Sequence, residues 1–209
     1  MWATAYPGAF ALARLARWRR LLSVGQGGLL SEQALRGLVG ELLFLKNAIL
    51  TIGAALSVAG WEGPFDAPKD FQLAGEAYEI KTISLGAATV SIASINQLDA
   101  APGILFLVVY ELAAVPAGSS GAITPIGLVE EIRTALVPHG CVLEDFNARL
   151  LAAGFEDQDP YRKMYFRVDG QRSFIVREGF PRLTRSELPH AIADASYELL
   201  LADCEAFRT

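Results

Sequence analysis

Hydrophobic residues recur at helical spacing in the first quarter of the chain. Residues 9–23, "AFALARLARWRRLLS", combine apolar positions with arginines at this period. They predict an amphipathic helix that packs on its own domain, on a membrane surface or on DNA. A second helix is expected to begin at Ser31, a favourable N-cap residue. Glu41 lies within it beside Gly40, and we expect it to face solvent or a cleft because burying an unpaired carboxylate is costly. The apolar stripe of this helix consists of Leu35, Leu38, Val39, Leu42, Leu45 and Ile49.

β-Favouring runs follow a loop rich in proline and glycine at 61–70. Two of them, separated by Gly75-Glu76, predict a hairpin. The nearly continuous apolar run "GILFLVVYEL" is typical of a strand that is covered on both faces. The elements expected here are strands at 70–74, 77–84 and 103–112, a further strand or a continuation of the second at 88–93, and a helix that opens within 94–101 with Ser94 as its candidate N-cap.

The second half of the chain predicts helices at 126–137 and 142–153, and a β-hairpin centred on Asp169-Gly170. The final segment is compatible with a helix or with a closing strand at 195–201. Helices that alternate with strands predict one α/β domain with a mixed sheet. Its expected parts are an N-terminal amphipathic helix at 1–30, a core at 31–112, and C-terminal helices with a hairpin at 113–209.

Composition agrees with a single folded domain. The chain has 209 residues, of which 52% are hydrophobic and 20% are charged. Its longest apolar stretches, 48–61 and 104–110, fall short of the ~20 residues that cross a bilayer, so no membrane partner is expected. No secretory signal is recognisable. Cys141 and Cys204 form neither a zinc motif nor a disulfide framework, which favours the cytoplasm.

Charge is distributed unevenly around a net value of −5. Residues 1–31 contain four arginines and no acid, and residues 161–187 contain seven basic residues against three acidic ones. A phosphate-binding surface is therefore expected from the two ends of the chain, although an ordinary solvated surface explains the same counts. The candidate phosphate contacts are Arg162, Lys163, Arg167 and Arg172.

One group of polar residues suggests metal chemistry. In a strand, Glu79 and Lys81 point to the same face, and Asp70 is expected on the neighbouring strand. Two carboxylates and the main-chain carbonyl of Ile80 would form a hard-oxygen site suited to Mg²⁺. The simpler alternatives are an exposed Glu79–Lys81 ion pair and an Asp70 that only caps a turn. The chain has no Gly-x-Ser-x-Gly motif and no P-loop, which excludes two common hydrolase types.

The order of these residues, a helix carboxylate followed by Asp-x(8)-Glu-Ile-Lys, resembles the PD-(D/E)xK nuclease superfamily. The phrases "GLVGELLFL", "WEGPFDAPKDF", "YEIKTIS" and "SINQLD" resemble an uncharacterised PD-(D/E)xK family associated with bacterial defence and restriction gene neighbourhoods. The resemblance covers about residues 31–206. It departs from the superfamily pattern before Asp70, where Lys69 follows Pro68, and in a shorter segment before the first helix.

The resemblance implies a restriction-endonuclease-like core and a Mg²⁺-dependent deoxyribonuclease, with Mn²⁺ as a substitute. Asp70, Glu79 and the Ile80 carbonyl would bind metal with help from Glu41. Lys81 would be catalytic, and Gln97 would match a glutamine found near the metal or substrate in some branches. DNA is the implied partner, with a homodimer or other defence proteins as possible further ones. The alternative is a catalytically silent nuclease-like subunit that binds DNA or protein.

Overall fold

The computed structural model describes residues 29–65, 67–100 and 103–209. The amphipathic helix expected at 9–23 therefore lies outside the described residues. The helices are α2 (Glu32–Ile52), α3 (Ala54–Ala59), α4 (Pro125–Leu136) and α5 (Gly140–Ala152), with 3-10 helices η1 (Gly63–Phe65), η2 (Ile95–Leu98), η3 (Asp159–Lys163), η4 (Arg185–Glu187) and η5 (Leu201–Phe207). The strands are β1 (Phe71–Leu73), β2 (Glu76–Ile83), β3 (Thr89–Ile92), β4 (Ile104–Ala114), β5 (Phe166–Val176) and β6 (Tyr197–Leu200).

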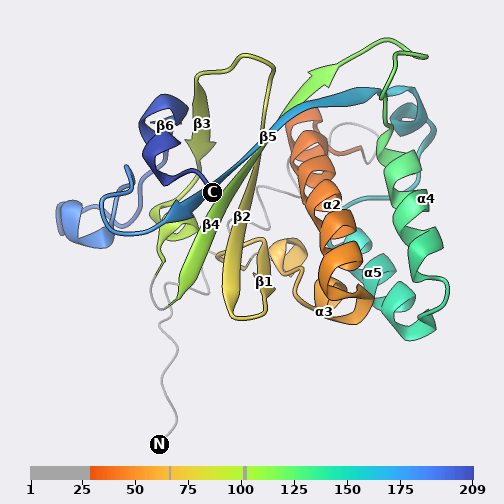
Figure 1. Cartoon of the computed structure of the whole chain (residues 1–209), viewed down its shortest axis with the longest axis horizontal. Coiled ribbons are helices and arrows are strands. Elements are labelled where there is room, and N and C mark those ends of the chain that lie inside the picture. The colour runs from red at the N-terminus through yellow and green to blue at the C-terminus, as the bar shows by residue number, and fades with distance from the viewer. Residues whose placement is uncertain (1–28, 66, 101–102) are drawn as a thin grey trace, which may run out of the picture.

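The central sheet is mixed, as expected for a restriction-endonuclease-like α/β core. Its four strands run in the order β1-β2-β4-β5. The β2–β4 pair is parallel, whereas β1–β2 and β4–β5 are antiparallel. Strands β3 and β6 form a separate antiparallel pair. In Figure 1, the helices α2 to α5 lie on one side of the view and the β3–β6 pair on the other.

A capping residue sets each end of helix α2. The Ser31 side chain accepts a hydrogen bond from the Ala34 backbone N–H, and Gly53 ends the helix with a φ of 93°. Gly40 allows the middle of α2 to approach β2, because a Cβ there would lie 2.5 Å from Thr82 Cγ2. This close approach brings the next residue, Glu41, toward β2.

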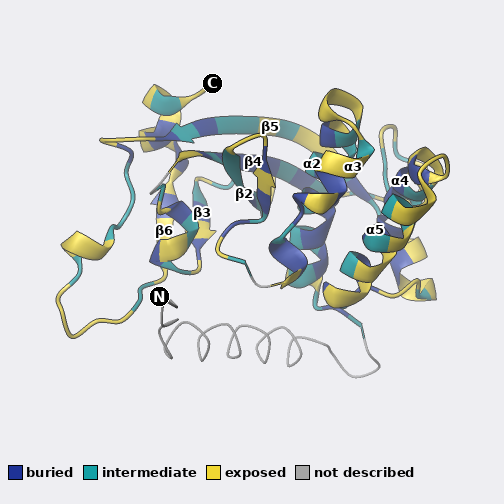
Figure 2. Cartoon of the chain, turned by 90° about the horizontal axis from the view of Figure 1, so that it is seen from below, coloured by how far each residue is buried: buried dark blue, intermediate teal, exposed yellow. Residues whose placement is uncertain are grey.

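Two hydrophobic cores fill the molecule. One joins α2, α4 and α5 to one face of the sheet and includes Leu42, Trp61 and Ile80. The other lies beneath β3, β6 and η5 and includes Leu107 and Phe174. Figure 2 shows exposed residues on the outer faces of α4 and α5, whereas much of β4 is buried. In the part of the chain that the structure describes, no helix combines the length and the apolar character that crossing a bilayer requires.

Three local predictions were wrong. β5 passes straight through Asp169-Gly170, where a hairpin turn was expected. The register shifts there because Glu111 pairs with Gly170 and Leu112 with Val168, so Asp169 is an extra residue in a β-bulge. The helix expected to begin after Ser94 is only the four-residue η2.

The turn of the β1–β2 hairpin also lies one residue earlier than expected. It consists of Ala74 and Gly75, which both have positive φ angles of 52° and 87°. Positive φ at both central residues is characteristic of tight hairpin turns, which match the twist of the strands. Glu76 is therefore already the first residue of β2 and pairs with Leu73.

Candidate active site

Glu79 and Lys81 point to the same face of β2, as the alternation of a strand requires. Glu79 is only 1% exposed, and Lys81 Nζ lies 2.8 Å from Glu79 Oε1. Apart from this ion pair, the buried Oε1 accepts no hydrogen bond from any described residue. The simpler alternative of an exposed ion pair is therefore wrong, because the Glu79 carboxylate is excluded from solvent.

The charges in this region are strongly coupled. Burial raises the pKa of Glu79 to about 8, and the Asp70 carboxylate adds to this effect, while Lys81 opposes it. Burial alone would lower the pKa of Lys81, but the carboxylates of Glu79, Asp70 and Glu41 together raise it. The three candidate carboxylates thus act on one ammonium group.

Asp70 lies immediately before β1 and contacts β2 directly. The Ile80 backbone N–H donates a hydrogen bond to Asp70 Oδ2 across 2.7 Å. The first residue of β1, Phe71, pairs with Tyr78 of β2. Asp70 comes one residue before Phe71, so it lies at the edge of β2 that β1 no longer covers. The N–H and C=O of one strand residue point to the same edge of the strand. The Ile80 carbonyl therefore also faces the side on which Asp70 lies.

Glu41 reaches the same region from α2. The indole N–H of Trp61 donates a hydrogen bond to Glu41 Oε2 across 2.7 Å. A Cβ on Gly63 would lie 2.7 Å from Glu41 Oε2 and 3.1 Å from Asp70 Oδ1. Two carboxylates thus converge on a backbone position where only glycine leaves them room.

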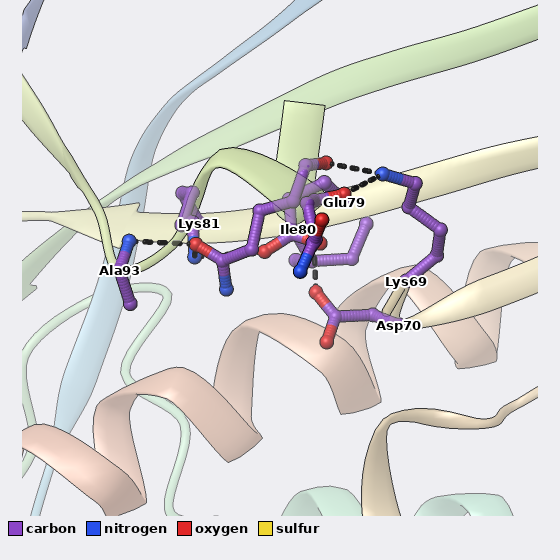
Figure 3. Close-up of polar contacts among 8 residues, drawn as sticks. Lys69, Asp70, Glu79, Ile80, Lys81 and Ala93 are labelled. Carbon is purple, nitrogen blue, oxygen red and sulfur yellow. Dashed lines mark hydrogen bonds and ion pairs between the residues drawn. The ribbon is translucent and has the colours of Figure 1, made fainter. Parts of the chain in front are cut away.

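Gln97 contacts the candidate catalytic lysine. Its side-chain Oε1 accepts hydrogen bonds from Lys81 Nζ at 3.0 Å and from the Ala93 backbone N–H at 2.8 Å. Figure 3 shows Asp70 pointing toward the backbone of Ile80. All five residues predicted as catalytic, Glu41, Asp70, Glu79, Lys81 and Gln97, therefore lie in one connected region.

Two further residues of this region were not predicted. Trp61 positions the Glu41 carboxylate, and Lys69 is buried with its ammonium group on the carbonyls of η2. In the sequence, Lys69 is visible only as a departure from the motif. Its position next to Asp70, before an apolar strand, is the signal that could have indicated a buried lysine.

The four candidate phosphate contacts lie away from this cluster or are paired with acids. Arg162, on η3 beside α4, lies 3.5 Å from Glu130, and Lys163 is on the same short helix. Arg167 pairs with Asp169. Arg172 shares the sheet face of Lys81, since both residues align with Val109 across the strands, but it pairs with Glu111 at 2.7 Å.

The residues of the cluster are suited by chemistry to a divalent ion. Carboxylates and a main-chain carbonyl are the ligands that Mg²⁺ and Mn²⁺ prefer. The converging oxygens beside Gly63 and the buried Glu79 Oε1 provide such donors. Within residues 29–65, 67–100 and 103–209, no group of three or more histidine, cysteine or acidic side chains has the geometry of a formed metal site. Binding of a metal ion would therefore require these side chains to move from the positions they have in the structure.

The sequence profile of one protein family, described as "Putative PD-(D/E)XK family member, (DUF4420)", matches residues 8–202. The chain belongs to this family. The match fits the resemblance to the PD-(D/E)xK superfamily, and it indicates a nuclease of a class that generally uses divalent metal ions. No match was found among curated proteins or among solved structures.

Proposed function

We propose that this PD-(D/E)XK family member is a Mg²⁺-dependent deoxyribonuclease that hydrolyses DNA phosphodiester bonds, with Mn²⁺ as a substitute. Asp70, Glu79, Glu41 and the Ile80 carbonyl hold the metal ion, and Lys81 is the catalytic lysine. The main support is the hydrogen bond from Ile80 N–H to Asp70 Oδ2, because the carbonyl of Ile80 points to the same edge of β2 as its N–H and so faces the side on which this carboxylate lies.

In this proposal each residue has a chemical task. When bound, a divalent ion neutralises charge on the scissile phosphate and lowers the pKa of a bound water. Lys81 Nζ donates hydrogen bonds to the attacking water and to the phosphate, where negative charge develops. Gln97 Oε1, already 3.0 Å from Lys81 Nζ, fixes the direction of that ammonium group. Trp61 performs the same task for the Glu41 carboxylate.

Cleavage of supercoiled plasmid and of single-stranded DNA tests the proposal. Wild type is compared with Asp70→Ala and Lys81→Ala in Mg²⁺, Mn²⁺ and EDTA, with Lys46→Ala as a matched control for an exposed lysine. We expect metal-dependent cleavage in wild type and in the control, and none in the two site variants. Wild-type rates in Lys81→Ala would show that Lys81 is not catalytic.

A second candidate function is a catalytically silent nuclease-like subunit that binds DNA or protein. It is favoured by the closed ion pair between Glu79 and Lys81, which occupies two residues that catalysis would need. Titration of labelled duplex DNA at several salt concentrations separates the two functions. Salt-dependent binding without turnover in any divalent ion favours the silent subunit.

The biological setting is proposed from the resemblance to families in restriction and defence gene neighbourhoods. We infer a role in bacterial restriction or phage defence, in the cytoplasm, with DNA as substrate. A homodimer or another defence protein is the proposed protein partner. The four residues Arg162, Lys163, Arg167 and Arg172 remain the proposed phosphate contacts.

A further inference from the structure

Lys69 is a buried cation immediately next to the site. Its side chain is almost excluded from solvent, and its ammonium group donates hydrogen bonds to the backbone carbonyls of Asn96 and Gln97, the latter at 2.8 Å. Burial lowers the pKa of Lys69 to about 8, although the Glu79 carboxylate opposes this shift. Because a buried lysine is costly, the benefit must come from what its ammonium group holds in place.

What Lys69 holds is the C-terminal end of η2. A second cation, Arg182, comes from the C-terminal part of the chain and donates a hydrogen bond to the carbonyl of Leu98. Lys69 and Arg182 together therefore bind three consecutive carbonyls, and we call this pair the cation clamp. Cations are favourable at this end of a helix, where the carbonyls carry partial negative charge.

Gln97 lies inside the clamped segment. Its backbone carbonyl accepts from Lys69, while its side-chain Oε1 accepts from Lys81 Nζ and from the Ala93 N–H. A four-residue 3-10 helix is too short to be stable alone. The position of the Gln97 side chain must therefore depend on contacts that other elements make with η2.

We propose that the cation clamp of Lys69 and Arg182 positions η2, so that Gln97 holds the Lys81 ammonium group in place. Lys69 and Arg182 are positioning residues in this arrangement. The catalytic consequence rests on the proposed function, whereas the structural consequence does not. Lys69 has no role in binding the substrate, because it is buried and its ammonium group is directed to two carbonyls (Figure 3).

The arrangement also explains the Lys69-Asp70 dipeptide. Lys69 contacts η2, and Asp70 accepts from the backbone of β2. Two adjacent residues thus fix both sides of the site, the metal-binding side through Asp70 and the lysine side through Gln97. A proline or an apolar residue at position 69 could not make the contact with η2.

Hydrogen exchange of the Ala93 amide tests the clamp without any assay of activity. This amide donates to Gln97 Oε1, although Ala93 itself is exposed, so its protection reports whether the Gln97 side chain is held. The Leu201 amide, bonded to the Ala88 carbonyl at the other end of β3, is the internal control. Exchange is measured by NMR in wild type, Lys69→Met, Arg182→Met, Gln97→Ala and the surface control Lys46→Met.

We expect Ala93 exchange to accelerate by about tenfold or more in Lys69→Met, Arg182→Met and Gln97→Ala, with Leu201 unchanged. Lys46→Met should match wild type at both amides. Lys69→Arg keeps the charge and the reach to the carbonyls, and it should restore most of the Ala93 protection. Unchanged Ala93 protection in folded Lys69→Met and Arg182→Met would overturn the proposal. If Lys69→Met does not fold, Arg182→Met and Lys69→Arg decide the question.

A double-mutant cycle on DNA cleavage tests the catalytic consequence. Lys69→Met should lower kcat by about tenfold to a hundredfold with little change in KM, because the reacting lysine is misplaced. In a Gln97→Ala background the same change should lower kcat by less than about twofold, since the contact it supports is already lost. Additive effects would show that Lys69 does not act through Gln97. Absence of cleavage in wild type counts against the nuclease function alone, and the exchange result still decides the clamp.

Discussion

Lys81 Nζ lies 2.8 Å from Glu79 Oε1, although the Glu79 carboxylate is almost completely excluded from solvent. An ion pair of this kind stabilises a fold weakly, because desolvation offsets most of the attraction between the charges. Glu79 also experiences the Asp70 carboxylate, which acts in the same direction as burial. The pair is therefore better explained by a function of β2 than by stability.

The raised pKa of Glu79 predicts a pH-dependent stability of the metal-free protein. The pKa is about 8 in the folded state against an ordinary value of 4.5, so the folded state binds more protons in this interval. This contribution is fully present below pH 4.5 and is lost as the pH rises through 8. Between about pH 5.5 and 7.5, the free energy of unfolding in EDTA should fall by up to about 1 kcal/mol per pH unit on this account.

Urea unfolding of wild type and Glu79→Gln over this range measures the effect. The difference between the two proteins removes the contributions of titrating groups that lie away from Glu79. The pKa of Lys69 is lowered to about 8, so the folded state releases this proton at a lower pH than the unfolded state does. Deprotonation of Lys69 therefore raises the free energy of unfolding as the pH increases further, and the range stops at about pH 7.5 for this reason. Equal slopes in the two proteins would contradict the raised pKa.

Gly40 is expected to be intolerant of a side chain, in contrast to Gly37 on the same helix. A Cβ at Gly40 would lie 2.5 Å from Thr82 Cγ2, whereas nothing lies within 4 Å of a Cβ at Gly37. Gly40→Ala should lower the free energy of unfolding by about 1–3 kcal/mol, because α2 must move away from β2. Gly37→Ala should raise it by up to about 1 kcal/mol through helix propensity. Urea unfolding of both variants checks this contrast.

Gly63→Ala tests the convergence of the two carboxylates. A Cβ at Gly63 would crowd Glu41 Oε2 and Asp70 Oδ1, so we expect Mn²⁺ affinity to fall by about tenfold or more, as for changes around metal ligands elsewhere. Gly140→Ala, where nothing lies within 4 Å, is the matched control. Isothermal titration with Mn²⁺ measures both variants. Identical affinities in wild type and Gly63→Ala would place the metal ion elsewhere.

Lys163 offers a test of the predicted phosphate contacts. Arg162, Arg167 and Arg172 have acidic partners close by, which reduce the charge that they present to DNA. Lys163→Gln should therefore reduce the magnitude of the negative slope of log K for duplex binding against log salt concentration by about 1. Arg167→Gln should reduce it by less. Duplex binding at several salt concentrations measures this, with Lys46→Gln as control. Equal slopes for Lys163→Gln and wild type would remove this residue from the interface.

Local patterns were sufficient for most elements of the fold. The Ser31 cap and the apolar stripe of α2 predicted that helix, and the continuous apolar run predicted the buried strand β4. The bulge in β5 was missed because Asp169-Gly170 is also a common turn sequence, and only pairing with β4 selects the extended form. Propensity cannot decide between two local structures that use the same residues.

The residue types of the site could be read directly from the chain. Alternation in β2 put Glu79 and Lys81 on one face, the expected hairpin put Asp70 on the neighbouring strand, and the resemblance connected these residues with Glu41 and Gln97. How these residues meet depends on packing, because their contacts join elements far apart in the chain. Trp61 holds the carboxylate of α2, and Lys69 with Arg182 holds η2. Burial and hydrogen-bond partners set the charge and direction of each side chain, and both arise only when these elements pack together.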